Sequence, residues 1–221
     1  MKKNYDKLSL WLNGILAAAH YLVGILFYKR LPDSVPLLYN FLRRTFVYGS
    51  KTILCFGIPT GFLLLFLVLT FAPQLDPRSR SYAQISQRYQ TIQNIILLFF
   101  SAVYWSHLHL ARGYTLAVLT LVPILGGMFL AAFGNYAVTL RPNYIVGIRT
   151  PWALNSEWNW RKTHRFAGRL WVAAGIVIIL CGFLYPPAAI CCLVPAILAP
   201  VIYSLALYLK QESNHTGGGE S

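Results

Sequence analysis

The chain has 221 residues, of which 57% are apolar and 11% carry a charge, and its mean hydropathy is +0.53. A soluble domain carries about 25% charged residues, so this composition excludes a soluble globular protein and indicates an integral membrane protein. The chain has six acidic residues and a net charge of +13, and none of the acids lies inside an apolar segment. This disfavours ion-coupled carriers, metal hydrolases and acid–base enzymes, because their sites need carboxylates.

Six apolar segments are long enough to cross a bilayer, which takes roughly 20 residues. They occupy residues 8–28, 52–72, 92–111, 115–135, 170–185 and 188–209. The first follows Lys2, Lys3 and Lys7 but is longer than the apolar region of a cleaved signal, so we interpret it as a permanent span. Pro186-Pro187 separates the last two and predicts a tight helical hairpin. The expected fold class is all-α: a polytopic integral membrane protein with a six-helix transmembrane bundle.

We divide the chain into three regions within one compact bundle. Residues 1–75 form an N-terminal two-helix membrane region with a basic outer loop, residues 76–212 a four-helix membrane region with a long loop at 134–169, and residues 213–221 a flexible tail. With the N-terminus inside, 13 of the 19 Lys and Arg residues fall on the cytoplasmic side. The sequence therefore predicts a multi-pass protein of the cell membrane with both termini and the long loop in the cytoplasm.

The loop after the first span is an exception to this charge bias. It carries five basic residues against one acid: Lys29, Arg30, Arg43, Arg44 and Lys51 against Asp33. Two interpretations stay open. The basic residues either anchor the loop to lipid phosphates or form a surface for a ligand that arrives from outside.

Two histidines lie within the predicted spans. His20 is in the middle of the first span and His107 is at a similar depth in the third, so they meet if these spans run parallel. An ionisable residue inside the membrane is a candidate functional site. The simpler interpretation is a neutral histidine that donates to a backbone carbonyl, and we expect Gln or Asn to replace either one without loss of activity. The cysteines lack metal-ligand spacing, so we expect packing roles for them and no metal site or cofactor.

The loop before the fifth span contains more Arg, Trp, Pro, Gly and Asn than a passive connection needs. It reads, in order, Gly134-Asn135-Tyr136, Arg141-Pro142-Asn143-Tyr144, Gly147-Ile148-Arg149-Thr150-Pro151-Trp152, Trp160-Arg161-Lys162-Thr163-His164-Arg165 and Gly168-Arg169-Leu170-Trp171. Asn155 and Ser156 are good N-caps, which predicts a short helix from there toward Arg165, before the fifth span.

Arg149 is the centre of the candidate site in this loop. Flanking prolines stiffen the backbone and Gly147 permits a positive φ, so Arg149 lies in a rigid turn. A guanidinium beside a hydroxyl and backbone donors suits a carboxylate or phosphate, and we expect the rings of Trp152 and His164 to frame the same site. The candidate residues for binding a partner or an anion are Asn135, Arg141, Pro142, Asn143, Gly147, Arg149, Thr150, Pro151, Trp152, Trp160, Lys162, Thr163, His164, Arg165 and Gly168. The alternative is a loop whose basic and aromatic residues only anchor it at the membrane surface.

These motifs, in this order and spacing, closely resemble the signature of the SdpI family, bacterial membrane proteins named for immunity to a secreted killing peptide. A second, weaker resemblance lies upstream. There, Leu31-Pro32-Asp33-Ser34-Val35-Pro36 and Tyr48-Gly49-Ser50-Lys51 look like the N-terminal domain that often accompanies the signature. This part diverges from the family pattern, because Leu37-Leu38 stands where a His is usual and Arg43-Arg44 where a Gly and an acid are common.

The resemblance implies a non-enzymatic immunity protein that blocks a membrane-active toxin peptide. In the family, such a protein can also hold a small transcriptional repressor at the membrane through its cytoplasmic loop. The expected partners are therefore the lipid bilayer, a secreted toxin peptide and a cytoplasmic repressor, without direct binding of nucleic acid. The alternative is a lipid- or anion-handling transporter or transferase in which Arg149, Arg161 and His164 bind a phosphate headgroup. A neighbouring gene for a small secreted peptide or repressor favours immunity, and a lipid-synthesis cluster favours the alternative.

Overall fold

The structure is a computed structural model that describes residues 7–40, 43, 45–75 and 86–216. Within these residues, six helices are long and apolar enough to cross a membrane, which confirms the predicted spans. They are α1 (Lys7–Tyr28), α2 (Ile58–Leu75, preceded by the π-helical turn η1, Ile53–Gly57), α4 (Ser86–Ala111), α5 (Thr115–Ala137), α7 (Glu157–Leu184) and α8 (Ala188–Thr216). Lys2, Lys3, Arg44 and the tail residues 217–221, which entered the sequence predictions, lie outside the described part.

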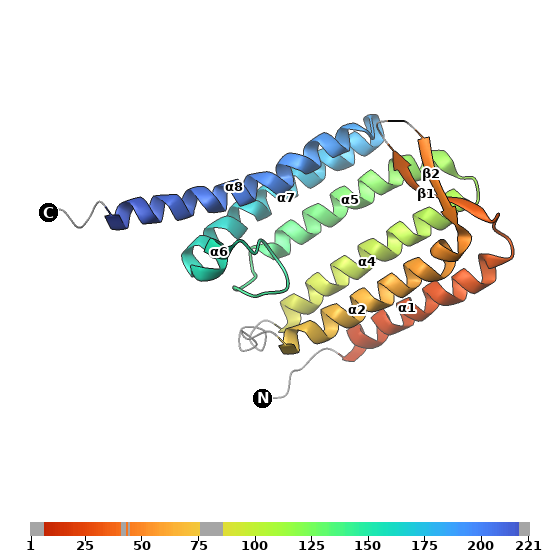
Figure 1. The fold of residues 1–221 in the computed structure, drawn as a ribbon, viewed down its shortest axis with the longest axis horizontal. Helices are drawn as coiled ribbons and strands as arrows, with labels where there is room; N and C mark the ends of the chain where they lie inside the picture. Colours follow the sequence, from red (N-terminus) through yellow and green to blue (C-terminus); the bar gives the residue numbers. More distant parts are fainter. Residues whose placement is uncertain (1–6, 41–42, 44, 76–85, 217–221) are drawn as a thin grey trace.

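The helices run back and forth along one axis (Figure 1). Neighbours in the sequence are neighbours in space: α1 packs on α2, α2 on α4, α4 on α5, α5 on α7, and α7 on α8. The start of α1, the end of α8 and the loop between α5 and α7 therefore lie at one end of the bundle. The turn between α7 and α8, at Pro186-Pro187, lies at the other end, and it confirms the predicted helical hairpin.

Large apolar side chains cover the outside of the bundle. Leu184 is 84% exposed, and many Leu, Ile and Val residues along α1, α7 and α8 are more than half exposed. A soluble protein rarely presents so much continuous apolar surface, whereas the hydrocarbon core of a bilayer covers it. The exposed surface thus agrees with helices that face lipid.

Glycines bring α5 and α7 into close contact. A methyl group placed on Gly127 would lie 2.6 Å from the carbonyl oxygen of Gly175, and one on Gly168 would lie 2.7 Å from that of Gly134. These glycines recur every seven residues on each helix, so they form one stripe along the contact between the two helices. Gly168, a candidate site residue, therefore packs two helices together.

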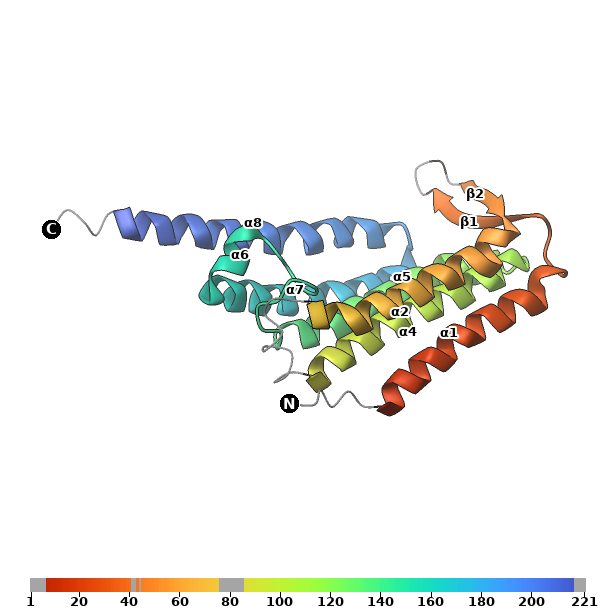
Figure 2. The same cartoon turned by 60° about the horizontal axis from the view of Figure 1, so that its bottom comes forward.

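A β-hairpin occupies the loop after the first span, which was described from the sequence only as a basic outer loop. Strand β1 (Ser34–Asn40) pairs antiparallel with β2 (Thr45–Ser50), and a register shift lies between Pro36 and Leu38. The hairpin lies at the end opposite the chain termini (Figure 2). The fold is mostly helical, as predicted, with this one addition among the described residues.

The hairpin joins the two upstream motif segments. Ser34 pairs with Ser50 and Val35 with Gly49, and Val35 is fully buried. At the base of the hairpin, the Lys51 ammonium lies 2.8 Å from Asp33 Oδ1. The hydrogen bond from Lys51, together with its charge, holds the pKa of the Asp33 carboxyl below its usual value. Residues that are far apart in the motif thus form one local structure.

Two helix boundaries differ from the predictions. The helix that begins after Ser156 does not stop near Arg165 but continues without a break to Leu184, so the expected surface helix is the first part of the fifth span. Gly134 of α5 packs against Gly168, close to the point where the expected surface helix and the fifth span join. Helix α8 continues to Thr216, so residues 213–216 of the expected tail are helical.

Candidate functional site

The loop between α5 and α7 is built around Asn143, which is buried. Its Oδ1 accepts hydrogen bonds from the backbone N–H groups of Ile145, at 2.9 Å, and Val146, at 2.8 Å. Its Nδ2 donates to the carbonyl of Arg141 at 2.9 Å. The side chain thereby replaces the backbone partners that this irregular segment lacks, as Asn commonly does in turns. Asn143 therefore shapes the loop and is not free to bind a ligand.

Gly147 and His164 fit together as a pair. Gly147 has a φ of +115°, a conformation that a residue with a Cβ rarely adopts. A Cβ at this position would also lie 2.5 Å from His164 Nε2. The loop can approach the histidine only because residue 147 is glycine.

His164 is neutral and fully bonded in this arrangement. The backbone N–H of Ile148 donates to Nε2 at 3.1 Å, so Nε2 carries no proton. Nδ1 lies 2.9 Å from the carbonyl of Trp160 and donates to it, since the neutral ring has its proton there. The side chain is buried. His164 therefore joins the loop to α7 and leaves no ring nitrogen for a phosphate.

Trp160 completes this inner layer. It is buried and stacks on His164 with ring centroids 4.0 Å apart. Its Nε1 donates to the carbonyl of Leu140 at 2.8 Å, which fixes the beginning of the loop. Trp160 and His164, which lie four residues apart on α7, thus form the floor beneath the loop.

A second polar cluster connects this region to α8. Ser204 Oγ donates to Asn159 Oδ1 at 2.7 Å and lies 3.0 Å from Thr150 Oγ1. Asn159 Nδ2 donates to the carbonyl of Ser204 at 2.9 Å, and Thr163 Oγ1 donates to Asn159 Oδ1 at 3.0 Å. Thr150 also caps α6 (Pro151–Asn155), where it accepts from the N–H of Ala153. The cluster ties three helices to the loop.

Two members of this cluster, Asn159 and Ser204, are not among the residues predicted from the sequence. Two signals were present: Asn159 lies one helical turn before Thr163, and Ser204 is the one serine within the sixth predicted span, 188–209. Their pairing depends on how α7 and α8 are rotated about their axes. Spacing along the chain does not reveal that rotation.

Arg149 is exposed and differs from these buried residues. Its Nη1 donates to the carbonyl of Tyr144 at 2.6 Å, which orients the guanidinium across the loop. Among the residues that the structure describes, Arg149 forms no ion pair. A guanidinium has five N–H donors in a fork, so this bond leaves donors that can bind an anion.

The expectation that the rings of Trp152 and His164 frame the site around Arg149 is wrong. His164 is buried beneath Gly147, and Trp152 stacks on Tyr208 of α8 with ring centroids 6.0 Å apart. The indole N–H of Trp152 is buried and has no partner within the described part of the protein. Gly147 lets the loop cover His164, whereas Trp152 packs against α8.

The remaining candidate residues do not converge on one site. The side chains of Arg141, Lys162 and Arg165 are exposed at this end of the bundle, and Asn135 is exposed on α5. Lys162 lies over the Trp158 ring at 5.9 Å. Pro151 is the first residue of α6, and Pro142 is half-buried in the loop. The structure thus separates a buried supporting set from an exposed basic set.

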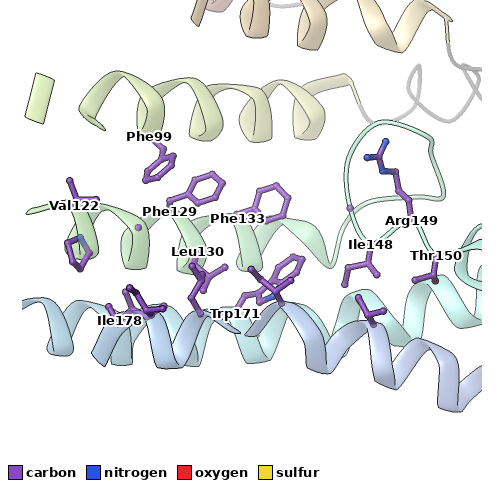
Figure 3. A pocket seen from close by; sticks show the side chains of 18 of the residues that line it. Phe99, Val122, Phe129, Leu130, Phe133, Ile148, Arg149, Thr150, Trp171 and Ile178 are labelled. Carbon is purple, nitrogen blue, oxygen red and sulfur yellow. The ribbon is translucent and has the colours of Figure 1, made fainter. Parts of the chain in front are cut away.

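Beside the loop lies a groove of about 1060 Å³. Figure 3 shows Phe99 of α4 and Phe129 and Phe133 of α5 on one side, with Ile178 of α7 on the other. Helix α8 contributes a second wall from Ala189 to Val201, and Arg149 and Thr150 lie at the loop end. We use "the groove" for this space between α4, α5, α7 and α8.

His20 and His107 line a smaller cavity of about 270 Å³ between α1, α2 and α4. His20 Nε2 lies 3.0 Å from Ser101 Oγ, and His107 Nδ1 donates to the carbonyl of Val103 at 2.8 Å. The two side chains share this cavity as the sequence suggested, and no hydrogen bond joins them. The backbone acceptor that we expected is present for His107.

Comparison with known proteins agrees with the motifs. Residues 139–207 match the SdpI/YfhL protein family. The chain is 26% identical to the immunity protein SdpI of Bacillus subtilis (strain 168) over 209 residues. The matched region covers 94% of this chain and 95% of that protein. No solved structure matches the chain significantly.

Proposed function

The chain belongs to the SdpI/YfhL family through residues 139–207, and from this premise we propose that it is an immunity protein that protects the membrane against a secreted killing peptide. The likeness to the SdpI immunity protein extends over 94% of the chain, so it includes the N-terminal helices and the hairpin as well as the family segment. At the family level, this likeness favours a protein without enzymatic activity.

The observation that carries the proposal is the construction of the signature loop. Its motif residues are used to hold one backbone shape, through the buried bonds of Asn143, His164 and Trp160. On this rigid support, Arg149 is exposed. A preformed turn with an exposed guanidinium suits recognition of a carboxylate or phosphate, because little conformational entropy is lost on binding.

A repressor-binding role uses the same end of the bundle. Arg141, Arg149, Lys162 and Arg165 give this end an exposed basic surface. Acidic side chains of a protein partner complement such a surface. We propose that a small cytoplasmic repressor binds here, and that binding of the toxin at the bundle changes the loop.

Both parts of the proposal require the loop end to face the cytoplasm. Single cysteines at Asn155, on the loop side, and at Ser34, on the hairpin side, test this in a cysteine-free background. We expect an impermeant thiol reagent to label Ser34→Cys but not Asn155→Cys in intact cells. Labelling of the loop position from outside would reverse the orientation.

Survival of sensitive cells tests the immunity function. Cells that express the chain are challenged with a panel of purified secreted membrane-active peptides, and survival is normalised to the amount of protein in the membrane. We expect protection against at least one peptide. Protection against none of them, in cells where the bacterial SdpI protein protects, contradicts the proposal.

Variants of Arg149 locate the activity. Arg149→Ala and Arg149→Lys should both impair protection, because lysine keeps the charge but loses the planar fork. Arg161→Lys and Arg169→Lys are matched controls on the exposed side of α7 and should protect fully. Full protection by both Arg149 variants would leave the loop as a membrane anchor.

The transporter or transferase alternative loses support at His164. Both nitrogens of this ring are bonded inside the protein, so the ring has no free group to hold a phosphate together with Arg149. Arg161 is paired with Glu157 at 3.4 Å on the exposed side of α7. The three-residue phosphate site of that alternative is therefore not assembled.

A further inference from the structure

We propose that the groove binds one anionic phospholipid, with its acyl chains along the apolar walls and its phosphate at Arg149. This inference goes beyond immunity, since it concerns a resident lipid and needs no toxin. It rests on the lining of the groove, its size, its open side and the charge at its end.

The lining changes character from one end of the groove to the other. Along its length, the side chains are apolar: Val122, Pro123, Phe129, Phe133, Ile178, Leu193 and Ile197. At the loop end, they are Tyr144, Arg149 and Thr150. Figure 3 shows Arg149 at this end, separated along the axis from Val122 and Ile178. An occupant must therefore be apolar over most of its length and anionic at one end.

The size of the groove fits hydrocarbon chains better than a complete transmembrane helix. The groove has a volume of about 1060 Å³. Hydrocarbon chains are much thinner than a helix, and sites for small ligands commonly have volumes of roughly 300–1,000 Å³. The volume thus favours a lipid over a peptide helix.

The groove opens toward the bilayer along α8. Leu193, Ile197 and Val201 line it and are also exposed. A lipid can enter sideways from the membrane without passing through the protein. The bilayer also supplies phospholipid at a far higher local concentration than any soluble apolar ligand.

Gly126 indicates that the space is kept open. A methyl group on Gly126 would meet no atom within 4 Å, whereas the next residue, Gly127, packs against α7. Glycine in a helix interior costs about 1 kcal/mol relative to alanine, and helix packing does not explain it here. A leucine at this position would project into the groove.

The charge at the loop end selects an anion. Arg149 lies at the groove, and its bond to Tyr144 fixes the guanidinium there. The rigid loop holds this position through Asn143 and Gly147. A phosphate accepts the remaining N–H donors in two-point fashion.

The experiment measures lipid retention by native mass spectrometry. The protein, purified in detergent without any killing peptide, is incubated with dioleoylphosphatidylglycerol or dioleoylphosphatidylcholine. We expect one retained phospholipid per protein and a preference of about tenfold for the anionic lipid, as suits a charge-assisted hydrogen bond. Retention of neither lipid, or of both equally, contradicts the proposal.

Two pairs of variants assign the parts of the site. Gly126→Leu should reduce retention of both lipids, whereas Gly14→Leu, also in open space but on α1, should not. Arg149→Gln should abolish the preference but keep residual binding, and Arg169→Gln on α7 should behave as wild type. Leu193→Trp narrows the groove from the opposite wall and serves if Gly126→Leu does not fold.

Unchanged lipid retention in Gly126→Leu and Leu193→Trp overturns the proposal. So does displacement of the lipid by a polyleucine spanning peptide at an equal molar ratio, because the occupant would then be a helix. Since no toxin is present, failure of this test leaves the immunity proposal untouched.

Discussion

The signature loop and the outer hairpin are connections at opposite ends of the bundle, and they are held in different ways. The loop has little regular structure, and buried side chains such as Asn143 and His164 supply its hydrogen bonds. The hairpin has its own backbone ladder and buries Val35 and Pro36, whereas other side chains are exposed: Leu38 is 65% exposed and Tyr48 61%. Substitution should therefore damage the loop more than the hairpin, even at positions that bind nothing.

This difference changes how mutational data on the loop must be interpreted. Loss of activity at His164 or Asn143 reports a damaged support, because both side chains are buried and bonded within the protein. Loss at Arg149 without loss of stability reports recognition. Stability measurements are thus needed beside every activity measurement.

Glycine substitutions should give the largest contrast between the two regions. Gly147→Ala forces a Cβ into a positive-φ conformation and toward His164, so we expect it to destabilise the protein by about 1–3 kcal/mol or more. In the hairpin, the Cβ of Gly49→Ala would overlap the end of the Leu37 side chain, which is flexible and can move, so its effect should be smaller. Thermal unfolding in detergent measures both. Equal losses would mean that the loop is no more rigid than the hairpin.

Substitutions of His164, at the loop, and His107, toward the hairpin end, should give the next largest difference in stability. His164→Asn keeps a donor near the carbonyl of Trp160 but removes the acceptor for the N–H of Ile148, so we expect a loss of about 1–3 kcal/mol. His107→Asn, toward the hairpin end, keeps its one backbone bond and should be nearly neutral. The same unfolding assay compares them. A stable His164→Asn variant would show that the loop does not need this acceptor.

The sequence predicted much of the fold because its signals are local. Apolar length determined the six spans, Pro186-Pro187 determined the last turn, and Ser156 determined where α7 begins. The hairpin was not predicted, because its strands carry no strict alternation of apolar and polar residues. The continuity of α7 was not predicted either. Basic residues at a membrane surface can lie on a separate surface helix or on a helix that continues out of a span, and the sequence does not distinguish the two.

The site was predicted only in part, because the type of a residue does not reveal whether its side chain faces the interior or the surface. Arg149 and His164 are both polar residues of the signature, yet one is exposed and the other is buried under the loop. The bond between Ser204 and Asn159 joins residues 45 positions apart, and only the packing of α7 on α8 brings them together. The functional role of the exposed basic residues stays a prediction.

A pair of serine substitutions tests the second polar cluster. Ser204→Ala removes a donor to Asn159, so we expect a loss of about 1 kcal/mol. Ser106→Ala, toward the hairpin end, removes only a bond to the carbonyl of Ala102 within the same helix and should change stability less. Chemical unfolding in mixed micelles is sensitive enough for this difference. An equal effect would show that the cluster does not couple α7 to α8.

The smallest expected effect concerns the ion pair at the base of the hairpin. Asp33 is 98% exposed, so its pair with Lys51 adds little stability, but it should be visible in titration. The lowered pKa of Asp33 means that its contribution is present above the unfolded pKa, about 3.9, and is lost as the pH falls through the folded value. The raised pKa of Lys51 means that its contribution is present below about 10.4 and is lost as the pH rises through its folded value. The ion pair therefore contributes stability between these two pH limits.

Lys51→Met should raise the pKa of Asp33 toward its usual value, as measured by carbon-13 NMR of the carboxyl group. The same pKa in both proteins would show that the hairpin base is held by its backbone alone.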